Sequence, residues 1–258
     1  MLFRSAADYA LASKDKIVIF YDMQEIAQLD KRGSKGKEKH VVTADEIADF
    51  KKLIVFENAD FIVINKPHGL ASQGGSGIKI SVDDIIQAIS DRYKLVHRLD
   101  KDTSGCLAIA KKTTAATKFA EMLQTGEMEK KYMAVVRGIP SQKHGIIDLP
   151  LLKKGVKVER MQVDRDGKEA KSEYKVLKRL GAEFALVELQ PHTGRTHQLR
   201  VHMAAIDCPI MGDGKYGGTE AFDERFSKKL HLHAFSLVCT PLGIKAEAKL
   251  PEHMEKLL

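Results

Sequence analysis

The sequence predicts an α+β fold with a mixed, mostly antiparallel sheet and flanking helices. Short runs rich in β-branched residues dominate the chain, and most breaks between them have the length of hairpin turns. A few patterns with helical spacing come between these runs, and no internal repeat is evident. With 43% hydrophobic and 30% charged residues among 258, the composition is that of an ordinary globular protein.

The expected strands are apolar or alternating runs that end at glycine or polar residues. The first two flank a short polar break and are expected to pair as a hairpin. The last alternates apolar and charged residues, as an amphipathic strand does. These runs are 54–56, 61–64, 132–136, 184–189 and 244–250.

Helices are expected where apolar residues recur every three or four positions. Residues 82–89 have this spacing. A second helix is expected to be capped by Thr113 or Thr114 and to stop at Gly126.

The chain is expected to divide near residue 43. Residues 16–21 are a strand-like run, and residues 31–40 are basic, polar and glycine-containing, as in a flexible linker. We therefore expect residues 1–43 to be a separate N-terminal segment and residues 44–258 to be the compact domain. Within that domain, residues 145–170 are rich in glycine and charge and predict turns and an irregular excursion.

Charge and cysteine content narrow the function classes. The net charge is +7, from 42 lysines and arginines against 35 aspartates and glutamates, which favours a polyanionic partner such as nucleic acid. The three cysteines are scattered, which fits a reducing cytosol and no disulfide framework. No apolar run approaches the roughly 20 residues of a membrane span, and the N-terminus lacks a secretory signal. We therefore expect a cytoplasmic protein without membrane contact.

The densest group of candidate catalytic side chains lies in His97–Gly105, a charged stretch directly before an apolar run. Asp100 stands between Arg98 and Lys101, and nearby positive charge favours an ionised carboxylate. Such a carboxylate can act as a nucleophile or a general base, although a structural ion pair would use the same residues. Asp102 has a different setting, because the turn-forming Thr103 and Ser104 follow it, and we expect it to accept backbone N–H groups.

A second polar cluster lies about a hundred residues downstream, on a segment in which Leu199, Met203 and Ile206 share one helical face. An arginine on such a helix can hold a buried carboxylate by paired N–H bonds, or can contact phosphates. The cluster contains Arg195, His197, Gln198, Arg200 and His202.

Histidine pairs invite a metal interpretation, which the spacing does not favour. Neither His197 with His202 nor His231 with His233 has the i, i+4 spacing of helical ligands, and no cysteine or acid completes a zinc set. Tyr132, on an expected strand after two lysines, is either a core residue or a platform on which a base stacks.

The stretch His97–Gly105, with the sequence HRLDKDTSG, resembles the signature of the RluA-type pseudouridine synthases. Five further segments resemble motifs of that family in the same order, and together they cover about residues 54–258. These segments are 65–70 (NKPHGL), 131–138 (KYMAVVRG), 194–202 (GRTHQLRVH), 209–217 (PIMGD and KYG) and 232–234 (LHA).

The resemblance implies a pseudouridine synthase core with a central RNA-binding cleft, formed by residues 44–258. It implies that Asp100 is catalytic, that Tyr132 packs on the target uridine and that Arg200 pairs with Asp100. It places Arg98 in the RNA-binding cleft, and it implies neither a cofactor nor a metal. Residues 1–43 would be the remnant of an S4-like RNA-binding module plus a basic linker.

The implied reaction is the isomerisation of uridine to pseudouridine within RNA, with the target base flipped out of its stack. The loop at residues 73–77 is similar to that of the RluC-like branch, which implies an enzyme acting on 23S ribosomal RNA. We expect the protein to be a monomer. A transfer RNA synthase of the same family and a catalytically silent RNA-binding homologue are the alternatives.

One rival enzyme class shares a local pattern. Residues 100–104 superficially resemble the aspartate-nucleophile motif of haloacid-dehalogenase-like phosphatases. That motif needs a long hydrophobic strand directly before it and alternating β and α elements. Here His97 and Arg98 interrupt the approach, and the expected strands are antiparallel.

Overall fold

The computed structural model describes residues 40–257, except residue 76 and residues 156–159. The expected strand at 16–21 lies outside the described residues, as does the expected linker apart from His40. No helix among the described residues is long and apolar enough to cross a membrane. The description that follows concerns the body that begins at Val42.

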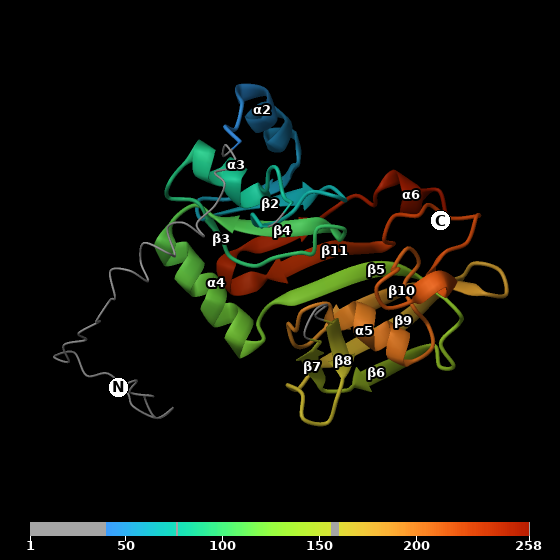
Figure 1. The fold of residues 1–258 in the computed structure, drawn as a ribbon. Helices are drawn as coiled ribbons and strands as arrows, with labels where there is room; N and C mark the ends of the chain where they lie inside the picture. The colour runs from blue at the N-terminus through green and yellow to red at the C-terminus, as the bar shows by residue number, and fades with distance from the viewer. Residues whose placement is uncertain (1–39, 76, 156–159, 258) are drawn as a thin grey trace, which may run out of the picture. The chain divides into compact units, whose positions relative to one another are not determined.

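One large sheet organises this body. Ten of the described strands form it, and its main path runs β1-β2-β4-β11-β5-β10-β9-β6, with β3 beside β4 and β12 beside β11. Neighbouring strands are antiparallel except β4 and β11, which are parallel. Figure 1 shows this order from β2 through β4, β11 and β5 toward β9 and β6. The predicted α+β class with a mixed, mostly antiparallel sheet is confirmed.

The first half of the chain builds the β1–β4 side of the sheet with three helices. Thr43 begins α2 with a capping box, in which its side chain and Glu46 satisfy each other's backbone N–H groups. The predicted hairpin is confirmed as β1 and β2, and the predicted helix over 82–89 is α3. The elements are α2 (Ala44–Lys52), β1 (Ile54–Glu57), β2 (Phe61–Lys66), α3 (Val82–Ile89), β3 (Lys94–Leu95), β4 (Ser104–Ala110) and α4 (Thr113–Thr125).

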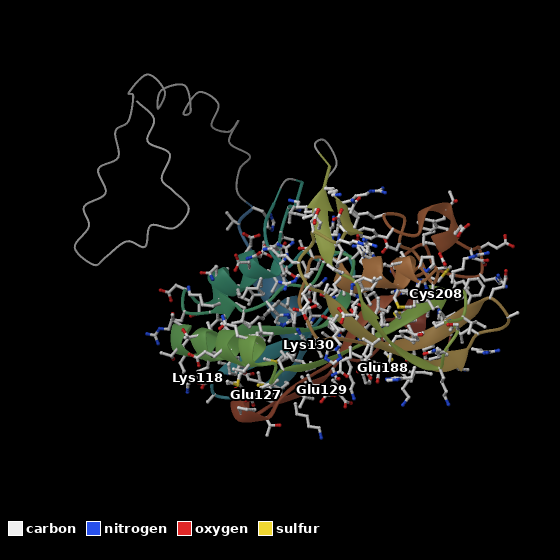
Figure 2. The ribbon with its side chains drawn as sticks, turned by 90° about the horizontal axis from the view of Figure 1, so that it is seen from below. Lys118, Glu127, Glu129, Lys130, Glu188 and Cys208 are labelled. Atoms are coloured by element: carbon white, nitrogen blue, oxygen red, sulfur yellow. The ribbon has the colours of Figure 1, made fainter. Side chains whose placement is uncertain are left out.

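The start of α4 differs from the prediction. Its N-cap is Lys112, in an extended conformation and without a side-chain cap, so Thr113 and Thr114 are helical residues. The predicted stop is correct, because Gly126 ends the helix with a left-handed φ of 77°. In the view from below in Figure 2, Lys118 on α4 and Glu127 after it lead toward Glu129 and Lys130 at the start of the next strand.

The second half completes the sheet and adds a two-stranded hairpin, β7 with β8. The predicted runs at 132–136 and 184–189 lie within β5 and β10, and the predicted final strand is shorter than expected. The elements are β5 (Glu129–Arg137), β6 (His144–Asp148), β7 (Leu151–Lys154), β8 (Arg160–Val163), β9 (Lys171–Arg179), β10 (Phe184–Pro191), α5 (Gln198–Ala205), η1 (Gly218–Ala221), β11 (Leu232–Cys239), η2 (Thr240–Leu242), β12 (Ile244–Glu247) and α6 (Glu252–Glu255).

The expectation of an irregular excursion over 145–170 is wrong where β6, β7 and β8 form. Gly145 lies inside β6, opposite Tyr174 of β9, and not in a turn. The ring of Tyr174 covers it, since a Cβ at this position would lie 2.6 Å from the Tyr174 hydroxyl. Glycine in this strand therefore marks a close approach of a neighbouring side chain.

The core lies on both sides of the sheet's centre, and two of its clusters meet near β5. One packs β2, β4 and β11 against α3 and α4, around Phe61, Leu107 and Phe119. Another packs β5 and β10 against α5, around Val187 and Met203. The first cluster holds β4, and both clusters contact β11 and β5. These three central strands carry the loop and the strand that hold the candidate site.

Candidate active site

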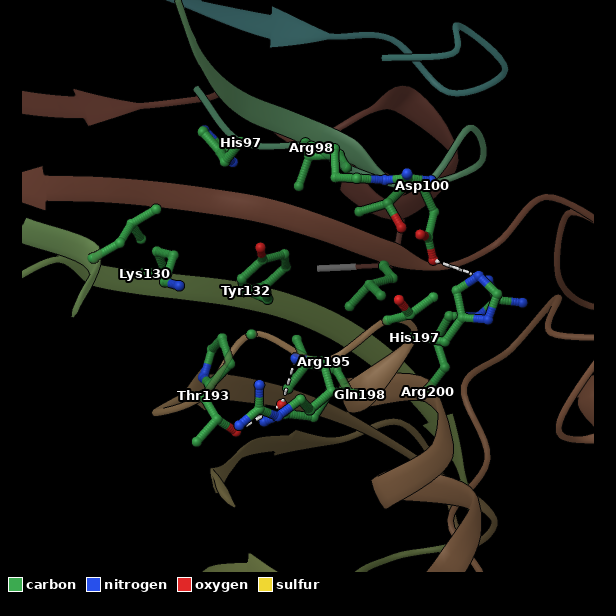
Figure 3. Close-up of a pocket in the computed structure, with 18 of the residues that line it drawn as sticks. His97, Arg98, Asp100, Lys130, Tyr132, Thr193, Arg195, His197, Gln198 and Arg200 are labelled. Atoms are coloured by element: carbon green, nitrogen blue, oxygen red, sulfur yellow. Dashed lines mark hydrogen bonds and ion pairs between the residues drawn. The ribbon is translucent and has the colours of Figure 1, made fainter. Parts of the chain in front are cut away.

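A cavity of about 350 Å³ contains all four predicted site residues. The loop before β4 supplies Arg98 and Asp100, strand β5 supplies Tyr132, and helix α5 supplies Arg200. Figure 3 shows Asp100 facing Arg200 and His197 at one end of the group, with Tyr132 between that end and Lys130. Residues about a hundred positions apart in the chain are thus brought to one pocket.

The loop that carries Asp100 is fixed by the backbone at Gly105, the second residue of β4. Gly105 has a φ of 107°, and a Cβ there would lie 2.2 Å from the carbonyl oxygen of Ala234. This contact belongs to the parallel pairing of β4 with β11. Only glycine permits so close an approach, so the glycine that ends the charged stretch sets the position from which Asp100 projects.

Asp100 is half-buried and faces two nitrogen groups. The Arg200 Nη1 donates to Oδ2 of Asp100 at 3.1 Å, and Nε2 of His197 lies 3.4 Å from the same oxygen. The pairing of Asp100 with Arg200 that the resemblance implied is present in the geometry. Asp100 is thereby oriented from one side, and the rest of its carboxylate faces the cavity that it lines.

Asp213 holds the other side of Arg200. Its Oδ2 accepts from Nε at 2.7 Å and its Oδ1 accepts from Nη2 at 2.8 Å, a two-point contact that fixes the guanidinium plane. Asp213 is 1% exposed, and its Oδ1 also accepts the backbone N–H groups of Lys215 and Tyr216. Burial acts to lower the pKa of Arg200, but Asp213, together with Asp100, raises it, so the guanidinium stays charged.

His197 and Tyr216 complete this end of the cavity. Nδ1 of His197 lies 2.6 Å from the Tyr216 hydroxyl, whose oxygen also accepts the N–H of Met161 at 3.3 Å. Burial lowers the pKa of His197, although Asp100 acts in the opposite direction, so the ring is neutral near pH 7. We place its proton on Nε2, because the Asp100 carboxylate can only accept, while the Tyr216 hydroxyl can donate to Nδ1.

Tyr132 is half-buried on β5 and lines the cavity beside Asp100. Burial raises the pKa of its hydroxyl, and the charge of Asp100 raises it further, so Tyr132 is a neutral phenol. A neutral aromatic ring beside a carboxylate can stack on a base. Arg98 is exposed at the same cavity, so its guanidinium is accessible to a bound polyanion.

Several neighbouring polar residues have other surroundings. The exposed Asp102 carboxylate lies 3.8 Å from Nε2 of His68, and burial lowers the pKa of His68, so the ring is neutral near pH 7. Gln198 is buried and bonded to Thr193, to Ser172 and to the backbone, which makes it a support for the turn before α5. Among the described residues, no three His, Cys, Asp or Glu side chains gather as a metal site requires.

Sequence reasoning missed the roles of Asp213, His197 and Tyr216 around Asp100. Asp213 and Tyr216 lie in the segment at 209–217 that resembles a family motif, so a signal was present, but the motif alone names no contact. The contact with Arg200 becomes visible only when α5 and the segment after it are placed together.

A family model described as RNA pseudouridylate synthase matches residues 60–205. The chain belongs to this family. The "Ribosomal large subunit pseudouridine synthase C" of Rickettsia bellii is 38% identical over 232 residues, which are 85% of this chain and 76% of that protein. The "Pseudouridylate synthase RPUSD4, mitochondrial" of Rattus norvegicus is 31% identical over 262 residues, covering 81% of this chain and 69% of that protein.

The pseudouridylate synthase fold is also found in solved structures. "Human RNA Pseudouridylate Synthase Domain Containing 4" matches with a TM-score of 0.68 and 28% identity, over 82% of this chain and 94% of the human one. "Human RNA Pseudouridylate Synthase Domain Containing 1" matches with a TM-score of 0.64 and 27% identity, over 77% of this chain and 82% of the other. The resemblance to RluA-type synthases and the enzyme class, an isomerase acting on RNA, are confirmed.

Proposed function

We propose that this pseudouridine synthase isomerises specific uridines of 23S ribosomal RNA. The observation that carries the proposal is the half-buried Asp100 carboxylate, held by Arg200 in a cavity that also contains Tyr132. The relatives from Rickettsia, which are named ribosomal large subunit pseudouridine synthase C, favour a large-subunit RNA as the substrate.

The roles proposed for the site residues follow from their positions. The target uridine leaves the RNA stack and enters the cavity, where the ring of Tyr132 stacks on the uracil. The bond between N1 and C1′ breaks, the uracil turns, and C5 forms a new bond to C1′. C5 then loses its proton, and N1 gains one. Asp100 is the catalytic residue of this exchange, and Arg200 positions its carboxylate before the reaction begins.

RNA outside the cavity is proposed to be held by charge. Arg98 is exposed at the cavity and contacts phosphates, and the net charge of +7 makes affinity depend on salt. The enzyme is proposed to act as a cytoplasmic monomer. Residues 44–258 are proposed as its catalytic domain, and residues 1–43 as an S4-like remnant with a basic linker.

Transfer RNA is the second candidate substrate, because a transfer RNA synthase of the same family would use the same residues of the cavity. A catalytically silent RNA-binding protein is the third candidate. It is disfavoured by the presence of Asp100, Tyr132 and Arg200 in one pocket.

Pseudouridine mapping of ribosomal and transfer RNA, from cells with and without the gene, tests the proposal. We expect pseudouridine to disappear from one or a few positions of 23S ribosomal RNA and to return when the gene is restored. A loss confined to transfer RNA would select the second candidate. Unchanged maps of both RNA classes would overturn the synthase assignment for these substrates.

A further inference from the structure

Lys130 is a half-buried cation that the site described so far does not use. It lines the same cavity as Asp100, yet its ammonium has no hydrogen-bond acceptor and no carboxylate partner among the described residues. Burial lowers the pKa of its ammonium. A half-buried ammonium at a cavity wall, with no carboxylate paired to it, has N–H donors free for a group that enters the cavity.

The alternation of strand β5 turns Lys130 toward the cavity. Glu129 and Lys131 lie on the opposite face of the strand and pair with each other at 3.0 Å, and the Glu129 hydrogen bond raises the pKa of Lys131. Lys130 shares its strand face with Tyr132, two residues on, and both line the cavity. Glu129, the acidic residue nearest to Lys130 in sequence, therefore pairs with Lys131 and not with Lys130.

His97 provides a second donor at this end of the cavity. The backbone N–H of Ala108 donates to its Nε2 at 2.8 Å, so that nitrogen carries no proton. Burial, with the charge of Lys130, lowers the pKa of His97 to about 3, so the neutral ring carries its proton on Nδ1. Phe119 stacks on the ring with planes 8° apart and fixes its orientation.

Lys130 and His97 therefore both present donors at this end of the cavity. An ammonium has three N–H donors, and His97 has only its Nδ1–H to offer. The surrounding walls are apolar, formed by Phe119, Leu123 and Leu237. A planar base fits between these flat apolar walls beside the ring of Tyr132, and a carbonyl oxygen on its edge can accept from these donors.

We propose that Lys130 and His97 form a uracil-reading subsite that receives the O4 carbonyl oxygen of the target base and rejects cytosine. The inference rests on the proposed function, in which Tyr132 stacks on the base and the sugar lies at Asp100. His97 and Lys130 lie on the other side of Tyr132 from Asp100, where the far edge of the base arrives (Figure 3). Uracil presents an acceptor at position 4, whereas cytosine presents an amino donor, which would face only donors here.

The test is a binding cycle on the RNA fragment that pseudouridine mapping identifies. Three versions of the fragment carry uridine, cytidine or a pyrimidin-2-one riboside, which lacks O4, at the target position. Each is titrated into the parent chain, into Lys130→Met, which keeps the side-chain length without the charge, and into the matched control Lys131→Met. Affinity is the readout, so a general defect in turnover does not enter the comparison.

For the parent chain and Lys131→Met, we expect removal of O4 to weaken binding by about 10- to 100-fold, as loss of a charge-assisted hydrogen bond does. For Lys130→Met, in which His97 can still donate to O4, we expect removal of O4 to weaken binding by about tenfold less than it does in the parent chain. The preference for uridine over cytidine should shrink by a similar factor.

Equal losses on O4 removal in the parent chain and in Lys130→Met would overturn the subsite. Tight binding of the pyrimidin-2-one fragment by the parent chain would do so without any variant, so the test does not depend on the variant folding. If the parent chain converts uridine in the fragment and these differences are absent, the subsite fails and the proposed function stands. If no RNA is converted by the parent chain, both fail together.

Discussion

Arg200 and Asp213 are joined by two hydrogen bonds, from Nε at 2.7 Å and from Nη2 at 2.8 Å, which leave Nη1 to reach Asp100. One planar guanidinium thus links a buried carboxylate, which has no access to substrate, to a carboxylate at the cavity. The planar fork is what allows both contacts at once, since its donors point in fixed and different directions.

Replacing Arg200 with lysine should therefore remove most of the activity. In Arg200→Lys the ammonium can pair with Asp213 or reach Asp100, but it cannot reproduce the two-point contact. We expect kcat for pseudouridine formation to fall by about 100-fold or more, with little change in RNA affinity. Near-normal kcat would show that the contact between residues 200 and 100 does not matter to the reaction.

Asp213 should act on the reaction without touching substrate, through Arg200 and through the backbone N–H groups of Lys215 and Tyr216 that donate to it. In Asp213→Asn the amide offers one acceptor where the guanidinium presents two donors, and its NH₂ group faces the other donor. We expect kcat to drop by about 10- to 100-fold, because a small misplacement of the catalytic carboxylate is costly, while KM stays close to that of the parent chain. The exposed Glu220 gives a control, since Glu220→Gln should leave both constants unchanged. A rise in KM alone would place Asp213 in substrate binding instead.

Gly105 should tolerate no side chain. A Cβ at this position meets the Ala234 backbone at 2.2 Å, whereas Gly126, with a similar positive φ, has no atom within 4 Å of the added Cβ. Gly126→Ala should lower the free energy of unfolding by about 1 kcal/mol, from backbone strain alone. Gly105→Ala should cost several times more, because strands β4 and β11 must also separate. Urea unfolding of both variants measures the difference, and equal losses would contradict the close approach.

Mild acid should destabilise the fold through buried neutral histidines. Burial lowers the pKa of both His231 and His233 to about 4, against about 6.5 in an unfolded chain. Because the unfolded chain takes up protons first, their stabilisation is complete above pH 6.5 and decreases as the pH falls toward 4. Each such group contributes a slope of up to about 1.4 kcal/mol per pH unit in that window. Urea unfolding at pH 7, 6 and 5 checks this, and a constant free energy of unfolding over that range would contradict it.

The centre of the site could be predicted because its residues are adjacent in sequence or fall in motifs. Asp100 stands out by its flanking cations, and the resemblance to the family supplied Tyr132 and Arg200. The contact between Arg200 and Asp213 could not be predicted, because it depends on where the chain returns after α5. The sequence places Lys130 on the same strand face as Tyr132. Only the structure shows that no carboxylate among the described residues pairs with it.

The fold, like the site, could be predicted only in part from the sequence. Hairpins and helices with regular spacing, such as the helix over 82–89, were predicted correctly. The strands β6 to β8 were missed, because they lie at an edge or in a separate hairpin and bury few residues, mainly Ile147 and Leu151. A strand of this kind has little apolar alternation, and its glycine and charged residues then indicate a loop.

The two aspartates of the charged loop give the most direct test of the account. Asp100 faces Arg200 inside the cavity, while Asp102, two residues on, faces His68 outside it. Single-turnover pseudouridine formation is to be measured for Asp100→Asn and Asp102→Asn on the RNA identified by mapping, together with RNA affinity. We predict that Asp100→Asn slows the reaction by about a thousandfold or more while RNA binding persists. Asp102→Asn should stay within about threefold of the parent chain, because Asp102 is exposed and does not line the cavity. Substantial turnover by Asp100→Asn, or equal losses in the two variants, would contradict the assignment of Asp100 as the catalytic residue.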